Sequence, residues 1–328
     1  STPLLPGFYE LQLDGSALLD TDGNALTGGT DGLSFHLPVS AAEELVRSPG
    51  APLTTGGYSV PSLADWNADG LSDLIVGEQD VSGGKVRVYL NSGTSERPLY
   101  DSFSFVQYAG ADQTVPCAGC RRVFPRGSDW NGDGLQDRVL GRSDGRGQGG
   151  PNTQAGAEPV FGEPSYLQVG EPGSKTELSV GARATLQIVD WNNDGSHDLV
   201  TGGLDGKVRV FLNSADAGEP DLRSELIVQD STGDLIVPTG RSGVAVTDLN
   251  GDGLKDLLLG NTEGQLIFYP NIGTDVEPVF DPWQALRADD VAIDLDGTPR
   301  SRPFVGDYDA DGLPDLLVGA QDGQVRLY

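Results

Sequence analysis

The sequence predicts an all-β protein in which one small antiparallel unit is repeated around a ring. An Asp/Asn-rich loop recurs five times along the 328 residues. Segments in which apolar and polar residues alternate follow the loops, as expected for half-buried strands. The chain also contains 47 glycines and 21 prolines, a composition that favours tight turns over long helices.

The five loops share the pattern Asp-x-Asn/Asp-x-Asp-Gly-x-x-Asp. Their first residues are separated by 64, 61, 58 and 59 positions, and a nearly constant period indicates a repeat architecture. The loops occupy residues 65–73, 129–137, 190–198, 248–256 and 307–315. Each loop therefore marks one structural unit.

Each unit continues in the same order after its loop. In the first unit the apolar run 74–77 follows the loop, and the alternating segment 85–90 follows a glycine-bearing turn. The fourth unit repeats this order at 257–260 and 265–269, and then has a Pro-containing stretch. These segments predict about four short antiparallel strands per unit, and four-stranded units repeated radially form a β-propeller.

The chain ends predict how this ring closes. The fifth unit stops at residues 324–328, its third strand, and a missing fourth strand would leave an open edge that favours aggregation. We expect the segment Leu33–Val39 to supply that strand, which gives a propeller of five blades over residues 33–328 and an N-terminal β-hairpin segment over 1–32. The alternative is a six-bladed ring with a degenerate first blade built from residues 1–45.

The spacing within each loop is that of a calcium site. Ca²⁺ takes six to eight oxygen ligands. Positions 1, 3 and 5 offer side-chain oxygens, Gly at position 6 permits the sharp bend, position 7 offers its carbonyl, and Asp at position 9 closes the cage. Position 12 is not the Glu of an EF-hand. A turn alone would not gather three or four acids in every loop, because their repulsion requires a cation.

We therefore expect one Ca²⁺ per loop, about five ions in all. The predicted ligands are Asp65, Asn67, Asp69, Leu71, Asp73, Asp129, Asn131, Asp133, Leu135, Asp137, Asp190, Asn192, Asp194, Ser196, Asp198, Asp248, Asn250, Asp252, Leu254, Asp256, Asp307, Asp309, Asp311, Leu313 and Asp315.

The overall charge excludes one class of partner. The formal net charge is −28, so the chain should repel the phosphate backbone and bind no nucleic acid. No apolar run reaches the roughly 18 residues of a membrane span, so we expect no membrane insertion. The chain begins at Ser1 without an initiator methionine, which we interpret as a processed or excised segment.

The repeated unit Asp-Trp-Asn-x-Asp-Gly-x-x-Asp-Leu-x-x-Gly resembles the FG-GAP-like (VCBS) repeat of integrin α-subunit propellers, secreted bacterial proteins and a fungal propeller lectin. The resemblance covers roughly residues 33–328 and implies a calcium-binding propeller that is extracellular or at the cell surface. Only Gly50-Ala-Pro52 echoes the Gly-Ala-Pro element, so integrin ligand binding is not implied. Residues 7–35 are similar to the closing strands of Ig-like domains, which would make the chain part of a larger modular surface protein.

Bulky residues recur at position 2 of the loops. They are Trp66, Trp130, Trp191, Leu249 and Tyr308. Because different bulky groups serve at this position, we expect packing between blades rather than sugar stacking. Trp283 lies outside the pattern and is the better candidate for stacking on a ligand.

The second unit departs from the others. Residues 145–154 lack apolar alternation where the third strand should be, and six arginines gather nearby. They are Arg121, Arg122, Arg126, Arg138, Arg142 and Arg146. One interpretation is an eroded blade with a solvated loop. The other is a site for an anionic glycan or an acidic protein, since Arg suits planar carboxylate or sulfate recognition; its candidate residues are Arg121, Arg122 and Arg126, with Trp283.

The remaining chemistry is sparse. Cys117 and Cys120 form a C-x-x-C pair, for which a local disulfide in an oxidising compartment is expected. No nucleophile elbow, H-E-x-x-H or P-loop motif occurs, so we expect no enzyme. The sequence thus predicts a secreted calcium-binding propeller that serves as a binding or adhesion module for a glycan or protein. The alternatives are a structural part of a bacterial surface layer or fibre, and a polysaccharide lyase-like enzyme.

Overall fold

The structure is a computed structural model that describes residues 38–39, 43–48, 50–116, 122–154, 159–215, 218–280, 283–288, 291–295 and 297–328. The predicted N-terminal segment 1–32, the pair Cys117 and Cys120, and Arg121 lie outside the described residues.

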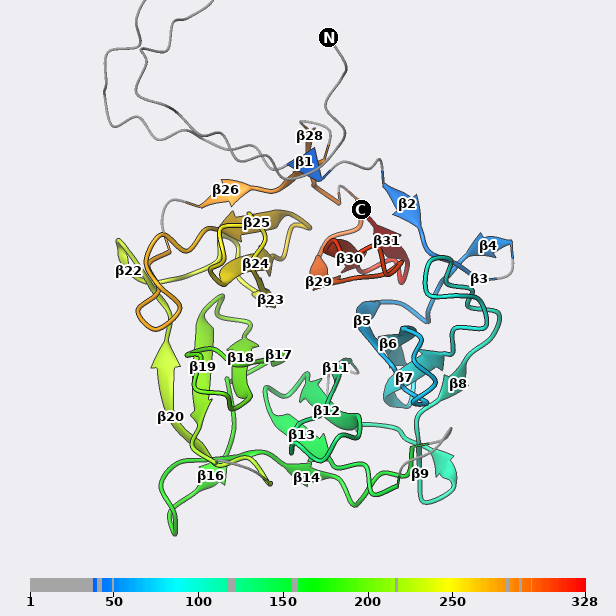
Figure 1. The fold of residues 1–328 in the computed structure, drawn as a ribbon, viewed down its shortest axis with the longest axis horizontal. Coiled ribbons are helices and arrows are strands. Elements are labelled where there is room, and N and C mark those ends of the chain that lie inside the picture. The colour runs from blue at the N-terminus through cyan, green and yellow to red at the C-terminus, as the bar shows by residue number, and fades with distance from the viewer. Residues whose placement is uncertain are drawn as a thin grey trace, which may run out of the picture.

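Five four-stranded antiparallel sheets surround a central axis, which confirms the predicted five-bladed propeller (Figure 1). We number the blades 1 to 5 in chain order. The innermost strands are β5 (Val60–Ala64), β11 (Val123–Ser128), β17 (Thr185–Val189), β23 (Gly243–Thr247) and β29 (Arg302–Gly306). The second strands are β6 (Asp73–Asp80), β12 (Asp137–Arg142), β18 (Asp198–Gly202), β24 (Asp256–Gly260) and β30 (Asp315–Gly319).

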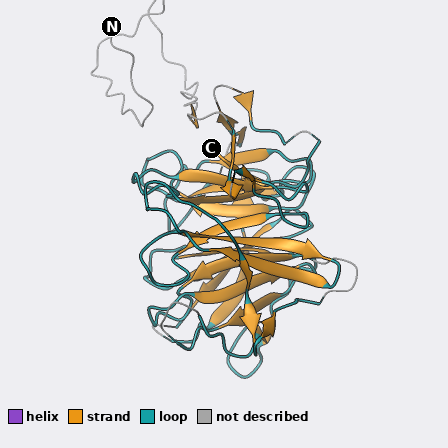
Figure 2. Ribbon diagram, turned by 90° about the vertical axis from the view of Figure 1, so that its right-hand side faces the viewer, coloured by secondary structure: helices purple, strands orange, loops and turns teal. Residues whose placement is uncertain are grey.

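The outer half of each blade carries the third and fourth strands. The third strands are β7 (Gly83–Tyr89), β13 (Gly147–Gly150), β19 (Val208–Asn213), β25 (Leu266–Tyr269) and β31 (Val325–Leu327). The fourth strands are β8 (Ser104–Phe105), β14 (Ser165–Tyr166), β20 (Leu222–Ile227), β26 (Gln284–Ala285) and β2 (Glu44–Leu45). In the perpendicular view every regular element drawn is a strand (Figure 2).

A short hairpin follows each fourth strand. The hairpins are β9 (Gln107–Tyr108) with β10 (Ala111–Asp112), β15 (Gln168–Val169) with β16 (Thr176–Glu177), β21 (Gln229–Asp230) with β22 (Gly233–Asp234), β27 (Arg287–Ala288) with β28 (Val291–Ala292), and β3 (Arg47–Ser48) with β4 (Ala51–Pro52). Each hairpin leads from one blade towards the innermost strand of the next.

An N-terminal strand closes the ring as predicted, but the residues differ from those expected. β2 pairs antiparallel with β31, with Glu44 opposite Leu327 and Leu45 opposite Arg326. In blades 1 and 5 a single residue separates the fourth strand from the hairpin that follows it. The expected segment 33–39 lies too far upstream of the hairpin β3–β4 to meet this spacing, whereas β2 meets it. Within that segment Pro38–Val39 forms β1, which pairs parallel with β27, and residues 33–37 lie outside the described residues.

The interpretation of blade 2 as eroded is wrong. β13 pairs with β12 on one side and with β14 on the other, so the blade is complete. Its glycines leave space that neighbouring side chains fill: a Cβ added at Gly150 would lie 2.3 Å from Nη2 of Arg138, and one added at Gly147 would lie 2.8 Å from Cδ1 of Leu167. The strand therefore lacks apolar alternation because its neighbours supply the packing.

The bulky residues at loop position 2 pack between blades, as expected. Trp66 of blade 1 lies 5.3 Å from Phe161 of blade 2, measured between ring centroids. Tyr308 of blade 5 lies 6.2 Å from Tyr100 of blade 1 in the same way. Four of the five are buried, namely Trp66, Trp130, Trp191 and Leu249. This packing repeats across the blade interfaces and includes the junction at which the ring closes.

Candidate metal centres

The five Asp-rich loops all occupy the same place in the fold. Each joins the innermost strand of a blade to its second strand. The innermost strands run in the same direction around the axis, so all five loops emerge on one face of the propeller. We call this the loop face, and we call the opposite side, where the innermost strands begin, the strand-start face.

Backbone amides fold each loop around its first carboxylate. In blade 1, Oδ1 of Asp65 accepts a hydrogen bond from the backbone N–H of Asp69 (3.0 Å), and Oδ2 accepts one from Gly70 (2.9 Å). Asp69 in turn accepts a hydrogen bond from the amide of Leu71 at 2.9 Å. The positive φ of Gly70, 88°, is the conformation for which glycine is suited at this bend. The side-chain oxygens at positions 1 and 5 are thereby held in one tight turn.

The aspartate at position 9 has a second role that the sequence analysis did not identify. Asp73 is fully buried, and its two oxygens accept hydrogen bonds from the backbone N–H of Trp66 (2.9 Å) and of Asn91 (2.7 Å). Asn91 follows the third strand, so this carboxylate ties the loop to the outer half of its blade. The acceptors that repeat this link in blades 2, 3 and 4 are Asp137, Asp198 and Asp256, and the donors are Asn152, Asn213 and Asn271.

A sequence signal for this link exists in the recurring asparagine. The side chain of Asn91 caps its own turn, with Oδ1 accepting from the amides of Gly93 (2.9 Å) and Leu99 (3.0 Å). Asparagine suits such a turn because its side chain bonds to the backbone two residues on. The sequence shows that this asparagine recurs at the end of the third strand or two residues after it in blades 1 to 4, but it does not show which residue its backbone contacts.

Burial and mutual repulsion raise the pKa values of the position-9 carboxyls. Desolvation raises the pKa of Asp256 to about 6, and the nearby charge of Asp252 acts in the same direction. Desolvation also raises the pKa of Asp315 to about 6, with contributions from Asp309, Asp311 and Asp307. Acidic groups that destabilise one another in this way favour a cation among them.

Three carboxylates converge in the fifth loop. One oxygen from each of Asp307, Asp309 and Asp315 lies within 4.8 Å of the others. In the other four loops position 3 is an asparagine, and in blade 1 its Nδ2 donates to Asp69 at 2.8 Å. All side chains at positions 1, 3, 5 and 9 present oxygen, the donor type that hard divalent cations prefer.

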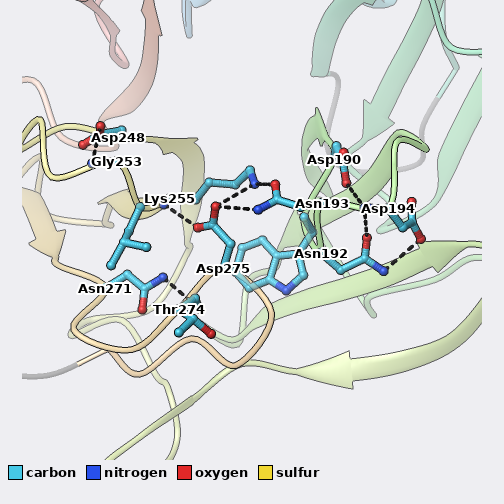
Figure 3. Close-up of polar contacts among 12 residues, drawn as sticks. Asp190, Asn192, Asn193, Asp194, Asp248, Gly253, Lys255, Asn271, Thr274 and Asp275 are labelled. Carbon is cyan, nitrogen blue, oxygen red and sulfur yellow. Dashed lines mark hydrogen bonds and ion pairs between the residues drawn. The ribbon is translucent and has the colours of Figure 1, made fainter.

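Neighbouring loops contact one another across the loop face. Asn193, at position 4 of loop 3, donates to Asp275 of blade 4 at 2.9 Å, and Lys255 of blade 4 contacts both residues (Figure 3). On its other side, Nδ1 of His197 lies 3.1 Å from the backbone oxygen of Asp129 in loop 2. Loop 3 is therefore fixed to both neighbouring blades.

The described arginines of the second unit do not form one surface. Arg138 is buried inside blade 2. Arg142 pairs with Asp144 at 2.9 Å, and Arg146 pairs with Glu177 at 3.2 Å. The remaining two point elsewhere: Arg126 is buried and donates to the backbone oxygen of Pro61 at 3.3 Å, and Arg122 donates to Gln79 at 3.1 Å. Trp283, the other ligand candidate, is 52% exposed.

The comparisons with known proteins identify the repeat. The model of the FG-GAP-like repeat matches residues 190–259 and 248–318. Integrin alpha-7 of Mus musculus is 32% identical over 169 residues, which are 47% of this chain and 13% of that protein. Integrin alpha-3 of Cricetulus griseus is 28% identical over 163 residues, 46% of this chain and 15% of that protein. The matched stretch is thus a small part of these relatives.

A solved structure shares the fold. The GH43_1 enzyme from Xanthomonas citri has a TM-score of 0.51 and 15% identity, with 85% of this chain and 89% of that chain covered. At this identity the likeness concerns the fold alone. Among the described residues, no helix has the length and apolar character to cross a membrane. The family-model match, the integrin relatives and the five blades lead to one conclusion: the chain is a five-bladed β-propeller whose residues 190–318 are FG-GAP-like repeats.

Proposed function

We propose that the protein is a calcium-stabilised propeller that acts as a binding or adhesion module for an extracellular partner. The observation that carries the calcium part is the convergence of Asp307, Asp309 and Asp315, whose oxygens lie within 4.8 Å of one another. The same loop pattern recurs in every blade, so we extend the assignment to all five loops and to the ligands predicted at positions 1, 3, 5, 7 and 9.

Calcium would act on stability rather than on chemistry. A bound ion neutralises the carboxylates of a loop and holds together the first two strands of its blade. The position-9 aspartate passes this constraint to the third strand, as the bond from Asn91 to Asp73 illustrates. Binding to the folded state alone stabilises it by about 2.7 kcal/mol per site at a ligand concentration 100 times Kd.

The similarity to integrin alpha subunits supports a role in binding an extracellular protein. A rigid ring with exposed turns on both faces suits such a role, because loops on a fixed framework commonly carry binding residues. A glycan is the second candidate ligand, because the exposed side chain of Trp283 is available for stacking on a sugar. An enzymatic function has no comparable support, since the likeness to a glycoside hydrolase structure concerns the fold alone.

Calorimetric titration of metal-free protein with Ca²⁺ tests this proposal. We expect saturable binding with a stoichiometry of about five ions, and a loss of one site in Asp315→Asn. Glu96→Gln is the matched control, because it removes a carboxylate from an exposed turn outside the loops. Absence of calcium binding to the wild-type protein would refute the metal assignment, and unchanged stoichiometry in Asp315→Asn would refute the assignment at loop 5.

The binding role has its own test. Immobilised protein would be screened against extracellular proteins and a glycan array in the presence of calcium. A specific partner whose binding disappears on chelation supports the module, whereas a catalytic product released from a polysaccharide panel would replace it with the enzyme alternative.

A further inference from the structure

One sequence position on the strand-start face is basic in four blades. The residue seven positions before the first aspartate of each loop is Tyr58, Arg122, Arg183, Arg241 or Arg300. Arg122 directly precedes an innermost strand, and one residue separates each of the other four from the start of its strand. The innermost strands contact one another in ring order around the axis, so the topology places the five residues in a ring at one end of that axis.

The side chains of this ring meet. The Arg122 guanidinium carbon lies 3.3 Å from the centroid of the Tyr58 ring, and that of Arg300 lies 4.9 Å from it. Nη1 of Arg300 also donates a hydrogen bond to the Tyr58 hydroxyl. Blades 1, 2 and 5 are thus joined at the axis, although they are far apart in sequence.

A fifth arginine lies beneath the ring. Arg302, two residues after Arg300, is buried, and its guanidinium carbon lies 5.6 Å from the Phe124 ring centroid. Burial, together with the nearby charges of Arg122, Arg241, Arg183 and Arg300, lowers the pKa of Arg302 to about 9. Arg302 therefore keeps its positive charge at neutral pH close to the other guanidinium groups.

Three carboxylates at the same end of the blades are engaged by other arginines. Asp144, Asp205 and Asp322 follow second strands on the strand-start face, and each pairs with an arginine of its own blade. Among the described ion pairs none involves Arg241, Arg300 or Arg302. In addition, Nη1 of Arg241 is buried and has no hydrogen-bond partner in the part of the chain that the structure describes.

Four residues of the ring have a strained backbone conformation with positive φ. Tyr58, Arg183, Arg241 and Arg300 have φ values of 58°, 60°, 64° and 76°, a conformation that non-glycine residues adopt at a cost of about 1 kcal/mol or more. Backbone hydrogen bonds to the preceding blade fix it, such as Tyr58 N–H to Gln321 O (3.2 Å) and Arg183 N–H to Ser143 O (3.1 Å). The ring is therefore rigid before any ligand arrives.

We propose that this arginine ring binds one tetrahedral oxyanion, a sulfate or phosphate group that is either free or an ester on a larger ligand. Each guanidinium has five N–H donors in a fixed plane. A planar carboxylate satisfies one or two arginines, whereas the oxygens of a tetrahedral dianion accept from several sides at once and offset more positive charge. The site lies at the opposite end of the innermost strands from the metal loops, so it is independent of the calcium proposal.

Calorimetric titration of the calcium-loaded full chain with sodium sulfate, sodium acetate and p-nitrophenyl sulfate at matched ionic strength tests this proposal. We expect one sulfate per chain, weaker binding of acetate, and a loss of sulfate affinity of at least about tenfold in Arg241→Gln. Arg97→Gln is the control, because Arg97 is an exposed arginine in a turn. If p-nitrophenyl sulfate binds as tightly as sulfate, the natural ligand is a sulfate or phosphate ester on a larger molecule. If p-nitrophenyl sulfate does not bind, the natural ligand is the free ion.

Melting curves separate a binding role from a structural one. In chloride, Arg241→Gln should melt at the same temperature as wild type or higher, because it removes a repelled cation. Sulfate should then raise the melting temperature of wild type and of Arg97→Gln more than that of Arg241→Gln, beyond the general stabilisation that sulfate gives to any protein. Absence of sulfate binding to wild type, equal binding by Arg241→Gln, or acetate binding as tight as sulfate would each overturn the proposal.

Discussion

The backbone N–H of Asn91 donates a 2.7 Å hydrogen bond to the buried carboxylate of Asp73, and this bond joins the end of a third strand to the metal loop. A carboxylate that serves both as a predicted metal ligand and as a backbone acceptor couples the loop to its blade.

The first prediction separates the two roles of the loop carboxylates. Asp73→Asn should lower the free energy of unfolding by about 2 kcal/mol in EGTA, because an amide turns one buried acceptor into a donor, and by more in calcium, because a predicted metal ligand is lost as well. Asp69→Asn, at an exposed position of the same loop, should lower stability mainly in calcium. Denaturant unfolding in calcium and in EGTA measures both effects, and an Asp73→Asn variant as stable as wild type in EGTA would contradict the backbone role.

Chelation should destabilise the whole propeller. Each tenfold drop in free calcium above Kd removes about 1.4 kcal/mol per site, and the repulsion of the loop acids is then uncompensated. Thermal melts across a series of buffered free-calcium concentrations would show a falling melting temperature. A flat series would refute a structural role for calcium, and an equal effect of magnesium would refute its selectivity.

Two truncations test which N-terminal residues close the ring. Removal of residues 1–42 eliminates the segment 33–39 but retains β2 and Glu43, which pairs with Arg326 at 3.3 Å. Removal of residues 1–49 also deletes β2 and exposes the edge of β31, so we expect a lower melting temperature and aggregation only in the longer truncation. Light scattering during a thermal melt distinguishes them, and equal behaviour would contradict closure by β2.

The glycines of β13 should be intolerant of a methyl group where an arginine fills their space. Gly150→Ala places a Cβ 2.3 Å from Nη2 of Arg138, and overpacking of this kind costs about 1–3 kcal/mol. Gly162→Ala is the control, since its nearest contact would be an ordinary 3.5 Å. If both variants unfold at the same denaturant concentration, Arg138 does not fill the space over β13.

Two tryptophans should respond differently to truncation. Trp66→Ala removes a buried side chain packed on Phe161 and should cost about 3–5 kcal/mol. Trp283→Ala removes a 52% exposed side chain and should change stability by about 0.5 kcal/mol or less. A glycan that binds wild type but not Trp283→Ala would show that Trp283 contacts the ligand. Unchanged binding would show that it does not.

Local chemistry made much of this propeller predictable. Period-two alternation, glycine-bearing turns and the repeated Asp-rich loop gave the blades, their number and the place of each loop between the first two strands. The exchange of Trp, Leu and Tyr at loop position 2 indicated packing, and burial at the blade interfaces confirms it. Each of these signals is confined to one unit, and repetition made it readable.

Relationships between distant segments required the tertiary structure. Only pairing with β31 shows that Glu44–Leu45, rather than residues 33–39, closes the ring. Only the packing of Arg138 and Leu167 explains why a run of glycines forms a strand. Only the ring places Arg122, Arg183, Arg241 and Arg300 around one axis instead of in separate units. Sequence patterns record what each residue needs locally, namely a turn, a face to bury or an oxygen for a cation. The partner that meets this need from another blade is selected by ring closure, which brings together residues more than 200 positions apart, such as Tyr58 and Arg300.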